Sequence, residues 1–207
     1  MAELIDHPCV QHKLAIIRDI DTGHKRFREL ATEITKFVCY EALKNIKMKE
    51  VTIQTPVAEA LCQKIDTDIV VVPILRAGVG MLEGILELVP TARVGFVGLY
   101  RDENTKLPVT YYERFPPQIE GGTCIVIDPM LATGGSTVAA IDALKHKGAD
   151  KIVVVCIVTC PEGIELVERE HPDVLIYAAA IDDRLNEKKY IVPGLGDAGD
   201  RLFGTSH

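Results

Sequence analysis

Apolar side chains recur along this chain in two spacings, and the two spacings alternate. Three- and four-residue intervals predict an amphipathic helix over about residues 24–46, and shorter helical patterns cover about 81–88, 138–144 and 163–170. Continuous apolar runs between them predict buried strands, at 68–75, 94–100, 124–127, 152–158 and 174–180. A further strand is predicted at 51–54. This alternation predicts an α/β fold, a mostly parallel central sheet flanked by helices.

The remaining segments predict how this sheet is completed. A length of 207 residues suits a single domain over 1–207, with an N-terminal helical region over about 1–46 and a C-terminal loop over about 183–205. Residues 103–118 depart most from either periodicity. They fold either as a hairpin arm that covers a site or meets a partner subunit, or with Phe115 and the preceding tyrosines packed on the sheet. We favour the packing interpretation for those aromatic side chains.

Composition narrows the classes of function. The chain is 47% hydrophobic and 26% charged, so it can bury a sizeable core. A formal charge of −7 argues against a general nucleic-acid or anionic-membrane binder. The N-terminus lacks a signal-peptide pattern, and no apolar run approaches the roughly 18 residues of a membrane span. Six cysteines without a C-x-x-C motif are expected to be reduced thiols, which predicts a cytoplasmic protein.

The most informative motif follows the apolar run at 124–127. Ligands of such sheets bind at the carboxyl ends of the strands, and this strand ends at Asp128. A small-residue loop, Ala132-Thr133-Gly134-Gly135-Ser136-Thr137, then leads into a helix. Backbone N–H groups and the helix dipole together favour an anion there, most simply a phosphate. The loop lacks the P-loop pattern, and the alternative interpretation is a plain turn with a helix cap.

Two arginines follow two other predicted strands. Arg76 comes directly after 68–75, with Ala77 and Gly78 behind it, and Arg101 comes after 94–100. Guanidinium groups at neighbouring strand ends are suited to a diphosphate. The alternative is that both arginines form ordinary surface ion pairs.

The C-terminal segment 190–205 is rich in glycine and poorly periodic. Gly194, Gly196 and Gly199 satisfy G-x-G-x-x-G, but too few residues follow for the helix, strand and acidic residue that a dinucleotide site requires. Glycines also let backbone N–H and C=O groups approach a planar ligand closely, and such groups can distinguish the edge of a base. A flexible tail is the alternative, although Ile191 and Phe203 are apolar anchors against it.

With these motifs the chain resembles the uracil phosphoribosyltransferases, a branch of the type I phosphoribosyltransferases. Residues 128–136, Asp-Pro-Met-Leu-Ala-Thr-Gly-Gly-Ser, resemble the loop of that family that binds 5-phospho-α-D-ribose 1-diphosphate (PRPP). Residues 73–78 and 100–101 resemble its other PRPP-binding segments, and 190–205 its uracil-binding loop. Most of the superfamily has two adjacent acidic residues after the strand. Pro129 replaces the second one here, which leaves Asp128 alone to meet the ribose hydroxyls.

The resemblance implies conversion of uracil and PRPP to UMP and diphosphate in pyrimidine salvage. The implied PRPP contacts are Arg76, Arg101, Asp128, Pro129, Met130, Leu131, Ala132, Thr133, Gly134, Gly135, Ser136 and Asp197. The implied uracil contacts are Ile191, Gly196, Asp197 and Ala198, and the implied catalytic residues are Asp128, Arg101 and Asp197. Magnesium is expected to bind through PRPP rather than in a protein metal site. A homo-oligomer, dimer or tetramer, and GTP as a candidate allosteric activator are also implied, without nucleic-acid or membrane partners.

Two other classes of function stay open at this point. A nicotinamide-dependent oxidoreductase would need a true dinucleotide motif, which the context of Gly194–Gly199 does not supply. A non-catalytic regulator that retains the PRPP site is closer, because a fold does not fix a function. Such a regulator would usually carry a basic nucleic-acid face, whereas this chain is acidic.

Overall fold

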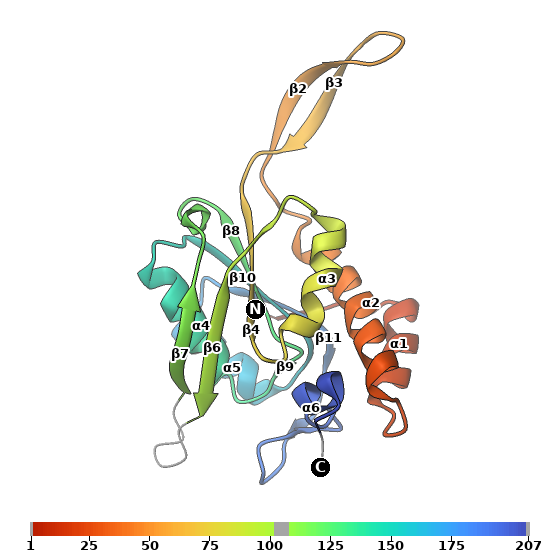
Figure 1. The fold of residues 1–207 in the computed structure, drawn as a ribbon, viewed down its shortest axis with the longest axis vertical. Helices are drawn as coiled ribbons and strands as arrows, with labels where there is room; N and C mark the ends of the chain where they lie inside the picture. The colour runs from red at the N-terminus through yellow and green to blue at the C-terminus, as the bar shows by residue number, and fades with distance from the viewer. Residues whose placement is uncertain (1, 102–107, 206–207) are drawn as a thin grey trace.

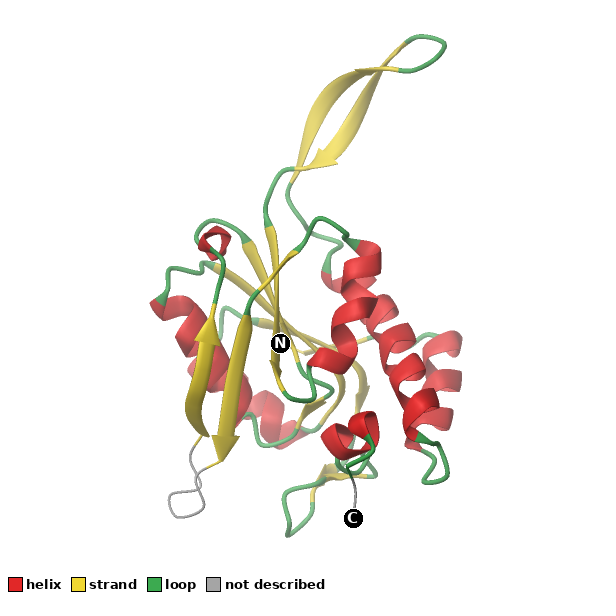
Figure 2. Ribbon diagram, in the orientation of Figure 1, coloured by secondary structure: helices red, strands yellow, loops and turns green. Residues whose placement is uncertain are grey.

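A central sheet of nine strands carries the fold in the computed structural model, which describes residues 2–101 and 108–205 (Figures 1 and 2). The strands lie in the order β1 (Ala2–Leu4), β11 (Leu175–Ile181), β10 (Lys151–Thr159), β8 (Thr123–Ile127), β4 (Ile69–Leu75), β6 (Phe96–Arg101) and β7 (Pro108–Arg114). The short β5 (Arg93–Val94) pairs with β4, and β9 (Met130–Leu131) pairs with β10. Every pairing is parallel except that of β6 with β7, as the apolar runs predicted.

Helices cover both faces of this sheet (Figure 2). One face is covered by α1 (Pro8–Arg18), α2 (His24–Ala42) and α3 (Val79–Leu88), and the other by α4 (Gly135–His146) and α5 (Pro161–Glu170). Alternate residues of one strand serve the two cores: Val71 faces the first set of helices, and Val70 and Val72 face the second. Burial on both faces explains why the central strands are apolar at every position. No helix among the described residues is long and apolar enough to cross a membrane.

The predicted helix at 24–46 ends earlier, at Ala42, and its apolar stripe is buried as expected. The N-terminal region is not wholly helical, because β1 adds an edge strand beside β11. The predicted strand 94–100 is divided at Gly95 into β5 and β6. A Cβ at Gly95 would lie 2.9 Å from the Phe115 ring, so the chain passes that aromatic side chain too closely for a larger residue.

The projecting hairpin is not where the sequence placed it. Strands β2 (Met48–Gln54) and β3 (Glu59–Ile65) pair with each other and extend away from the body of the molecule (Figure 1). Only 51–54 was predicted as a strand, because alternation in β2 is confined to the half-buried Val51 and Ile53 and no position of either strand is fully buried.

The predicted arm at 103–118 behaves differently. Its residues 108–114 form β7, an antiparallel strand of the main sheet, while 102–107 lie outside the described residues. The Tyr111 ring lies over Gly98, where a Cβ would be 2.5 Å from it, and Phe115 packs against the core. Packing on the sheet is therefore confirmed for Phe115 and, over Gly98, for the Tyr111 ring, whereas Tyr112 is 46% exposed.

The contact between α2 and α3 supplies a test of this packing. A Cβ at Gly84 of α3 would lie 2.6 Å from the carbonyl oxygen of Thr32 in α2. We expect Gly84→Ala to lower the free energy of unfolding by about 1–3 kcal/mol, because a backbone atom cannot move aside as a side chain can. Urea denaturation followed by circular dichroism measures this change.

Gly23→Ala is the matched control, since a Cβ there meets nothing within 4 Å and the backbone φ is −65°. Because Gly23 is the N-cap of α2, where alanine is less favoured than glycine, we expect a loss of about 1 kcal/mol or less, without any clash. Equal effects of the two substitutions would contradict the proposed close approach of α2 and α3.

Candidate active site

Three of the predicted site residues stand at the carboxyl ends of three adjacent parallel strands. Asp128 follows β8, Arg76 follows β4, and Arg101 is the last residue of β6. Since β8, β4 and β6 are neighbours in the sheet, the fold brings these positions to one edge. The Arg101 side chain lies outside the part of the chain that the structure describes.

Asp128 is half-buried at the end of β8. Burial raises its pKa from the ordinary 3.8 to about 7, and the Met130 N–H, which donates to Oδ1 at 3.3 Å, only partly opposes that effect. The turn itself is rigidly held, because the Pro129 carbonyl accepts hydrogen bonds from the N–H groups of Ile157 and Val158 at 3.1 and 3.0 Å. The structure therefore presents a half-buried carboxyl group with a raised pKa, which an incoming hydroxyl or cation would help to ionise.

The loop after Asp128 is tied down on its carbonyl side. The Thr159 hydroxyl donates to the Leu131 carbonyl at 3.0 Å, and the Cys160 thiol donates to the Ala132 carbonyl at 3.3 Å. A Cβ at Gly163 would lie 2.5 Å from the same Ala132 oxygen, so α5 also approaches the loop closely. These contacts to its carbonyl groups hold residues 131 and 132 of the loop in place.

Helix α4 begins at the end of this loop with its N-terminal N–H groups available. Its N-cap is Gly134, in the left-handed region at φ +82°, and no described side chain caps the helix there. The first turn holds no acidic residue, Thr133 is half-buried, and Ser136 is exposed. A helix N-terminus without a side-chain cap and with flanking hydroxyls has the geometry that favours an anion, and anion binding by this loop stays a prediction.

The C-terminal segment meets this edge through Arg76. The Arg76 side chain is 63% exposed, and its Nη2 lies 3.8 Å from Oδ1 of Asp200. Asp197 is exposed and caps α6 (Ala198–Phe203) by accepting from the Asp200 N–H at 2.9 Å. A Cβ built on Gly199 would lie within 3.8 Å of both Asp197 Oδ1 and Arg76 Nη2, so these two predicted residues flank the same backbone.

The predicted base-binding residues lie in one short segment before and within α6. Ile191, in β13 (Ile191–Val192), and Ala198 are buried, whereas Gly196 is exposed and has φ +72°. Strand β13 pairs with β12 (Arg184–Leu185) in a small antiparallel ribbon.

Sequence reasoning missed three residues whose side chains hydrogen-bond to this segment, Asp182, Arg18 and Arg201. Asp182 could have been found from the sequence, since it also follows a predicted buried strand. Nothing in the sequence pattern pointed to the two arginines.

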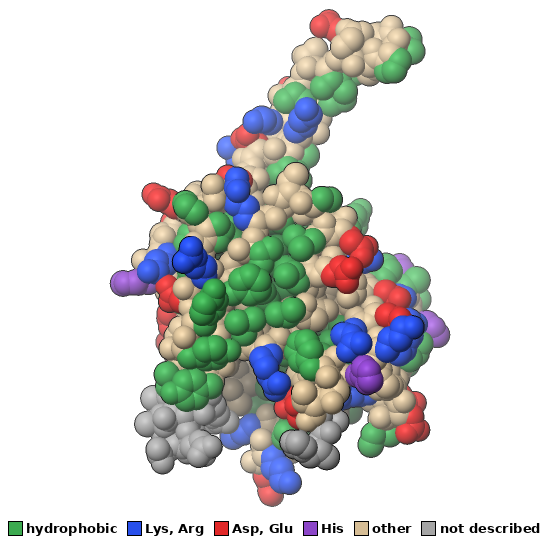
Figure 3. Space-filling view, in the orientation of Figure 1, with side chains coloured by type: hydrophobic (Ala, Val, Ile, Leu, Met, Phe, Trp, Pro, Cys, Tyr) green, Lys and Arg blue, Asp and Glu red, His purple; other side chains and the backbone are tan. Residues whose placement is uncertain are grey.

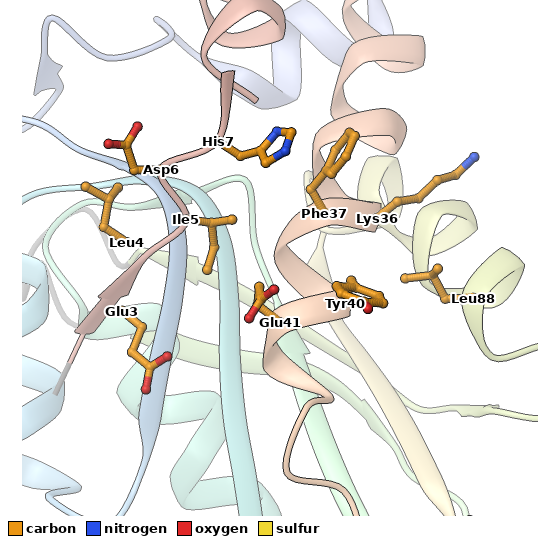
Figure 4. A pocket seen from close by; sticks show the side chains of 10 residues that line it. All are labelled: Glu3, Leu4, Ile5, Asp6, His7, Lys36, Phe37, Tyr40, Glu41 and Leu88. Atoms are coloured by element: carbon orange, nitrogen blue, oxygen red, sulfur yellow. The ribbon is translucent and has the colours of Figure 1, made fainter. Parts of the chain in front are cut away.

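A separate cavity lies away from these residues. It has a volume of about 610 Å³ and is lined from β1, α2 and α3 by Leu4, His7, Phe37, Tyr40 and Leu88 among others (Figure 4). His7 caps α1 through a hydrogen bond from the Cys9 N–H and stacks on Phe37 at 5.9 Å, so it packs and caps as a histidine without a metal role would. None of the predicted site residues lines this cavity. Among the described residues, no group of three or more potential metal-ligating side chains is found.

The parallel sheet, with these residues at its strand ends and this loop after β8, defines the class of the type I phosphoribosyltransferases. Solved hypoxanthine phosphoribosyltransferases share the fold: one from Staphylococcus aureus has a TM-score of 0.53 at 13% identity, covering 76% of each chain. A solved protein of Aquifex aeolicus is far more similar, with a TM-score of 0.92 at 40% identity over 100% of this chain and 99% of that one.

The sequence profile described as "Uracil phosphoribosyltransferase" matches residues 4–205. The uracil phosphoribosyltransferase of Geobacillus kaustophilus is 55% identical over 203 residues, 98% of this chain and 97% of that protein. That of Dictyoglomus thermophilum is 55% identical over 206 residues, 99% of this chain and 100% of that protein. The chain belongs to the uracil phosphoribosyltransferase family.

The raised pKa of Asp128 gives a prediction in two parts. The Asp128 carboxylate is expected to accept hydrogen bonds from the substrate, so the enzyme needs this group ionised. The pH dependence of kcat/KM reports the pKa values of the free enzyme. We therefore expect kcat/KM for PRPP to rise with pH through about 7. We expect Asp128→Asn to lose turnover by about 10²–10³ and to lose this pH limb, while a limb from the substrate phosphates is retained. Initial rates between pH 5.5 and 9 measure both.

Stability separates this loss from a folding defect. The folded pKa lies above the unfolded one, so ionisation of Asp128 disfavours the fold; the penalty is absent below about pH 4 and grows as the pH rises to 7. Asp128→Asn removes that penalty, and its Tm at pH 8 should equal or exceed that of the wild type. A Tm lowered at pH 8, or wild-type turnover, contradicts the assignment of Asp128.

Proposed function

We propose that this protein transfers the phosphoribosyl group of PRPP to uracil, giving UMP and diphosphate in pyrimidine salvage. The observation that carries the proposal is the meeting of two segments at one sheet edge. The proposed phosphate loop 128–136 follows β8, the neighbour of β4, and Arg76 follows β4 itself. A Cβ on Gly199 would lie 3.3 Å from Asp197 Oδ1, in the proposed base segment 191–198, and 3.8 Å from Arg76 Nη2. Both segments resemble those of the family to which the chain belongs.

The proposed mechanism follows from the charge that develops during transfer. As diphosphate leaves, positive charge builds on the ribose ring and negative charge on the leaving group. Arg76 and Arg101 are proposed to neutralise the diphosphate, and Asp128 to orient the ribose hydroxyls. The backbone of Pro129–Ser136 is proposed to hold the 5′-phosphate, so that binding energy remote from the reacting carbon positions that carbon. No covalent nucleophile is needed.

Magnesium is proposed to enter with PRPP. When bound, it would neutralise charge on the diphosphate. Asp128 fits a place near this cation, because partial burial raises the pKa of its carboxyl group and, among the described residues, no positive side chain opposes that effect. Asp197, exposed beside Arg76, is a second carboxylate that fits. The uracil ring must lose a proton, for which Asp197 is one candidate acceptor and water or diphosphate the others.

We propose further that the enzyme is a homo-oligomer, a dimer or tetramer. The arm formed by β2 and β3 supports this, because it projects from the body and carries apolar side chains in the open (Figure 3). Val57 is 93% exposed and Leu61 67%, and Met48 and Ile65 are exposed as well. A lone two-stranded hairpin is marginally stable in water, so a second copy of the chain is the proposed cover for it.

A cytoplasmic location is proposed on the six cysteines, which are all free thiols. Burial raises the pKa of Cys124 to about 12 and also raises those of Cys39 and Cys156, so these thiols stay protonated and unreactive. GTP as an activator rests on the family resemblance alone and is tested by adding it to the assay below.

The activity itself is tested with radiolabelled bases, PRPP and magnesium. We expect uracil to become its nucleotide and hypoxanthine, adenine and orotate to stay unconverted, because buried polar groups matched to one base reject the others. Conversion of a different base would retain the PRPP site but overturn the assignment of 191–198. No conversion of any base, with PRPP binding intact, would favour the non-catalytic regulator.

The arm is tested by Val57→Ser combined with Leu61→Ser. We expect the dissociation constant of the oligomer to rise at least about tenfold, since each lost apolar contact is worth about 1.5–3 kcal/mol when fully buried. Sedimentation equilibrium measures it, and the exposed pair Gln63→Ser and Lys64→Ser on the same strand is the control. A wild-type monomer at micromolar concentration would show the oligomer proposal to be wrong.

A further inference from the structure

The base segment is held by the far end of the chain. Arg18, the last residue of α1, forms a bidentate ion pair with Asp182, which lies one residue after β11. Its Nη2 donates to Oδ1 at 2.7 Å and its Nη1 to Oδ2 at 2.8 Å. Asp182 is only 8% exposed, so this pair is largely shielded from water.

The same pair holds both polar groups of one residue in the base segment. The Gly194 N–H donates to Asp182 Oδ2 at 2.8 Å, and the Gly194 carbonyl accepts from Arg18 Nη1 at 2.8 Å. Gly194 has φ +63°, and a Cβ there would lie 2.2 Å from the Ile191 carbonyl oxygen. The pair therefore fixes a turn that glycine alone can make, between Ile191 and Gly196, two predicted uracil contacts.

A second arginine extends the same attachment to the next residue. Arg201 Nη1 donates to the Leu195 carbonyl at 3.0 Å, while Nη2 donates to the Asp19 carbonyl beside the end of α1. Its guanidinium lies 4.5 Å from the ring centroid of Phe27, a fully buried side chain of α2. Two consecutive carbonyls, at 194 and 195, thus point to arginines anchored in the helical layer.

We propose that Arg18, paired with Asp182, is a positioning residue for uracil recognition. The proposal rests on the proposed function, because it takes 191–198 as the base-binding segment. Base choice by backbone hydrogen bonds requires those groups to stand within a fraction of an ångström of their places. The Arg18–Asp182 pair supplies that fixation, and its effect is therefore on the binding of uracil and not on PRPP.

The side-chain chemistry explains why arginine is used here. Arg18 makes three hydrogen bonds from one planar group, two to the carboxylate and one to the carbonyl at a different angle. A lysine ammonium retains the charge but not this fork. Removing the guanidinium altogether leaves Asp182 buried without its partner, which frees the Gly194 turn.

The test compares Arg18→Gln and Arg18→Lys with the wild-type enzyme in steady-state kinetics on both substrates. We expect Arg18→Gln to raise the KM for uracil about tenfold, as loss of charged hydrogen bonds implies, with the KM for PRPP changed less than about twofold. Arg18→Lys should recover part of the uracil affinity. Asp182→Asn should act in the same direction, and the double variant with Arg18→Gln should be no worse than the poorer single one.

Lys13→Gln is the matched control. Lys13 also lies in α1, forms an ion pair with Glu33 of α2, and has a side chain as shielded as that of Arg18 (22% against 23% exposed). It should change the Tm without changing the KM for uracil. Equal uracil KM values in Arg18→Gln and wild type, or equal rises for uracil and PRPP, overturn the positioning role.

The outcome is separable from that of the proposed function. All rates are measured well below each Tm, and Arg18→Lys serves if Arg18→Gln does not fold. A wild-type enzyme that converts uracil while neither Arg18 variant changes its uracil KM refutes the positioning role alone. A wild-type enzyme that converts no uracil refutes the proposed function, and the positioning role with it.

Discussion

Burial of the central strands on both faces is the constraint on which the rest of this structure depends. Strands β4, β8 and β10 are covered by α1, α2 and α3 on one side and by α4 and α5 on the other, so their side chains are apolar at nearly every position. A polar side chain along such a strand would lose its hydrogen bonds to water, at a large cost in free energy. It is confined to their ends, and because the strands are parallel these ends share one edge.

The proposed phosphate loop, residues 128–136, would let an acidic protein bind an anion without many cations. The loop carbonyls at 131 and 132 are bound from behind by Thr159 and Cys160, and α5 approaches through Gly163. The attraction for a phosphate then comes from the N–H groups at the start of α4, where no side chain of the described residues forms a cap. Backbone dipoles add no net charge, which is compatible with a formal charge of −7.

Sequence reasoning succeeded where the signal was local. The apolar runs gave the parallel strands within a residue or two, and the loop after β8 was found because its strand, turn and helix start are contiguous. It failed where the structure depends on partners distant in the chain. Gly95, where the predicted strand divides, lies against Phe115, which is 20 residues further along the chain. The arm of β2 and β3 has no fully buried position to reveal it, and Arg18 lies 164 residues from Asp182. No periodicity marks such a pair, since each side chain alone is typical of a surface residue. The roles of the site residues remain predictions that the proposed experiments address.

The N-terminal helices hold the C-terminal base segment in place, although the two are far apart in the sequence. The phosphate loop is fixed by the sheet, since β9 pairs with β10 and the Pro129 carbonyl binds two N–H groups of that strand. The base segment has only a two-stranded ribbon of its own, too small to be rigid alone. Its fixation comes from α1 and α2 through Arg18 and Arg201, and from Leu202, which packs where a Cβ on Gly80 of α3 would lie. The N-terminal helices therefore do more than cover one face of the sheet. They hold the base segment in a fixed position, as the sheet holds the proposed phosphate loop. A transfer between two bound molecules requires both segments to be fixed relative to one another, because the reacting atoms must be held at one distance and one angle.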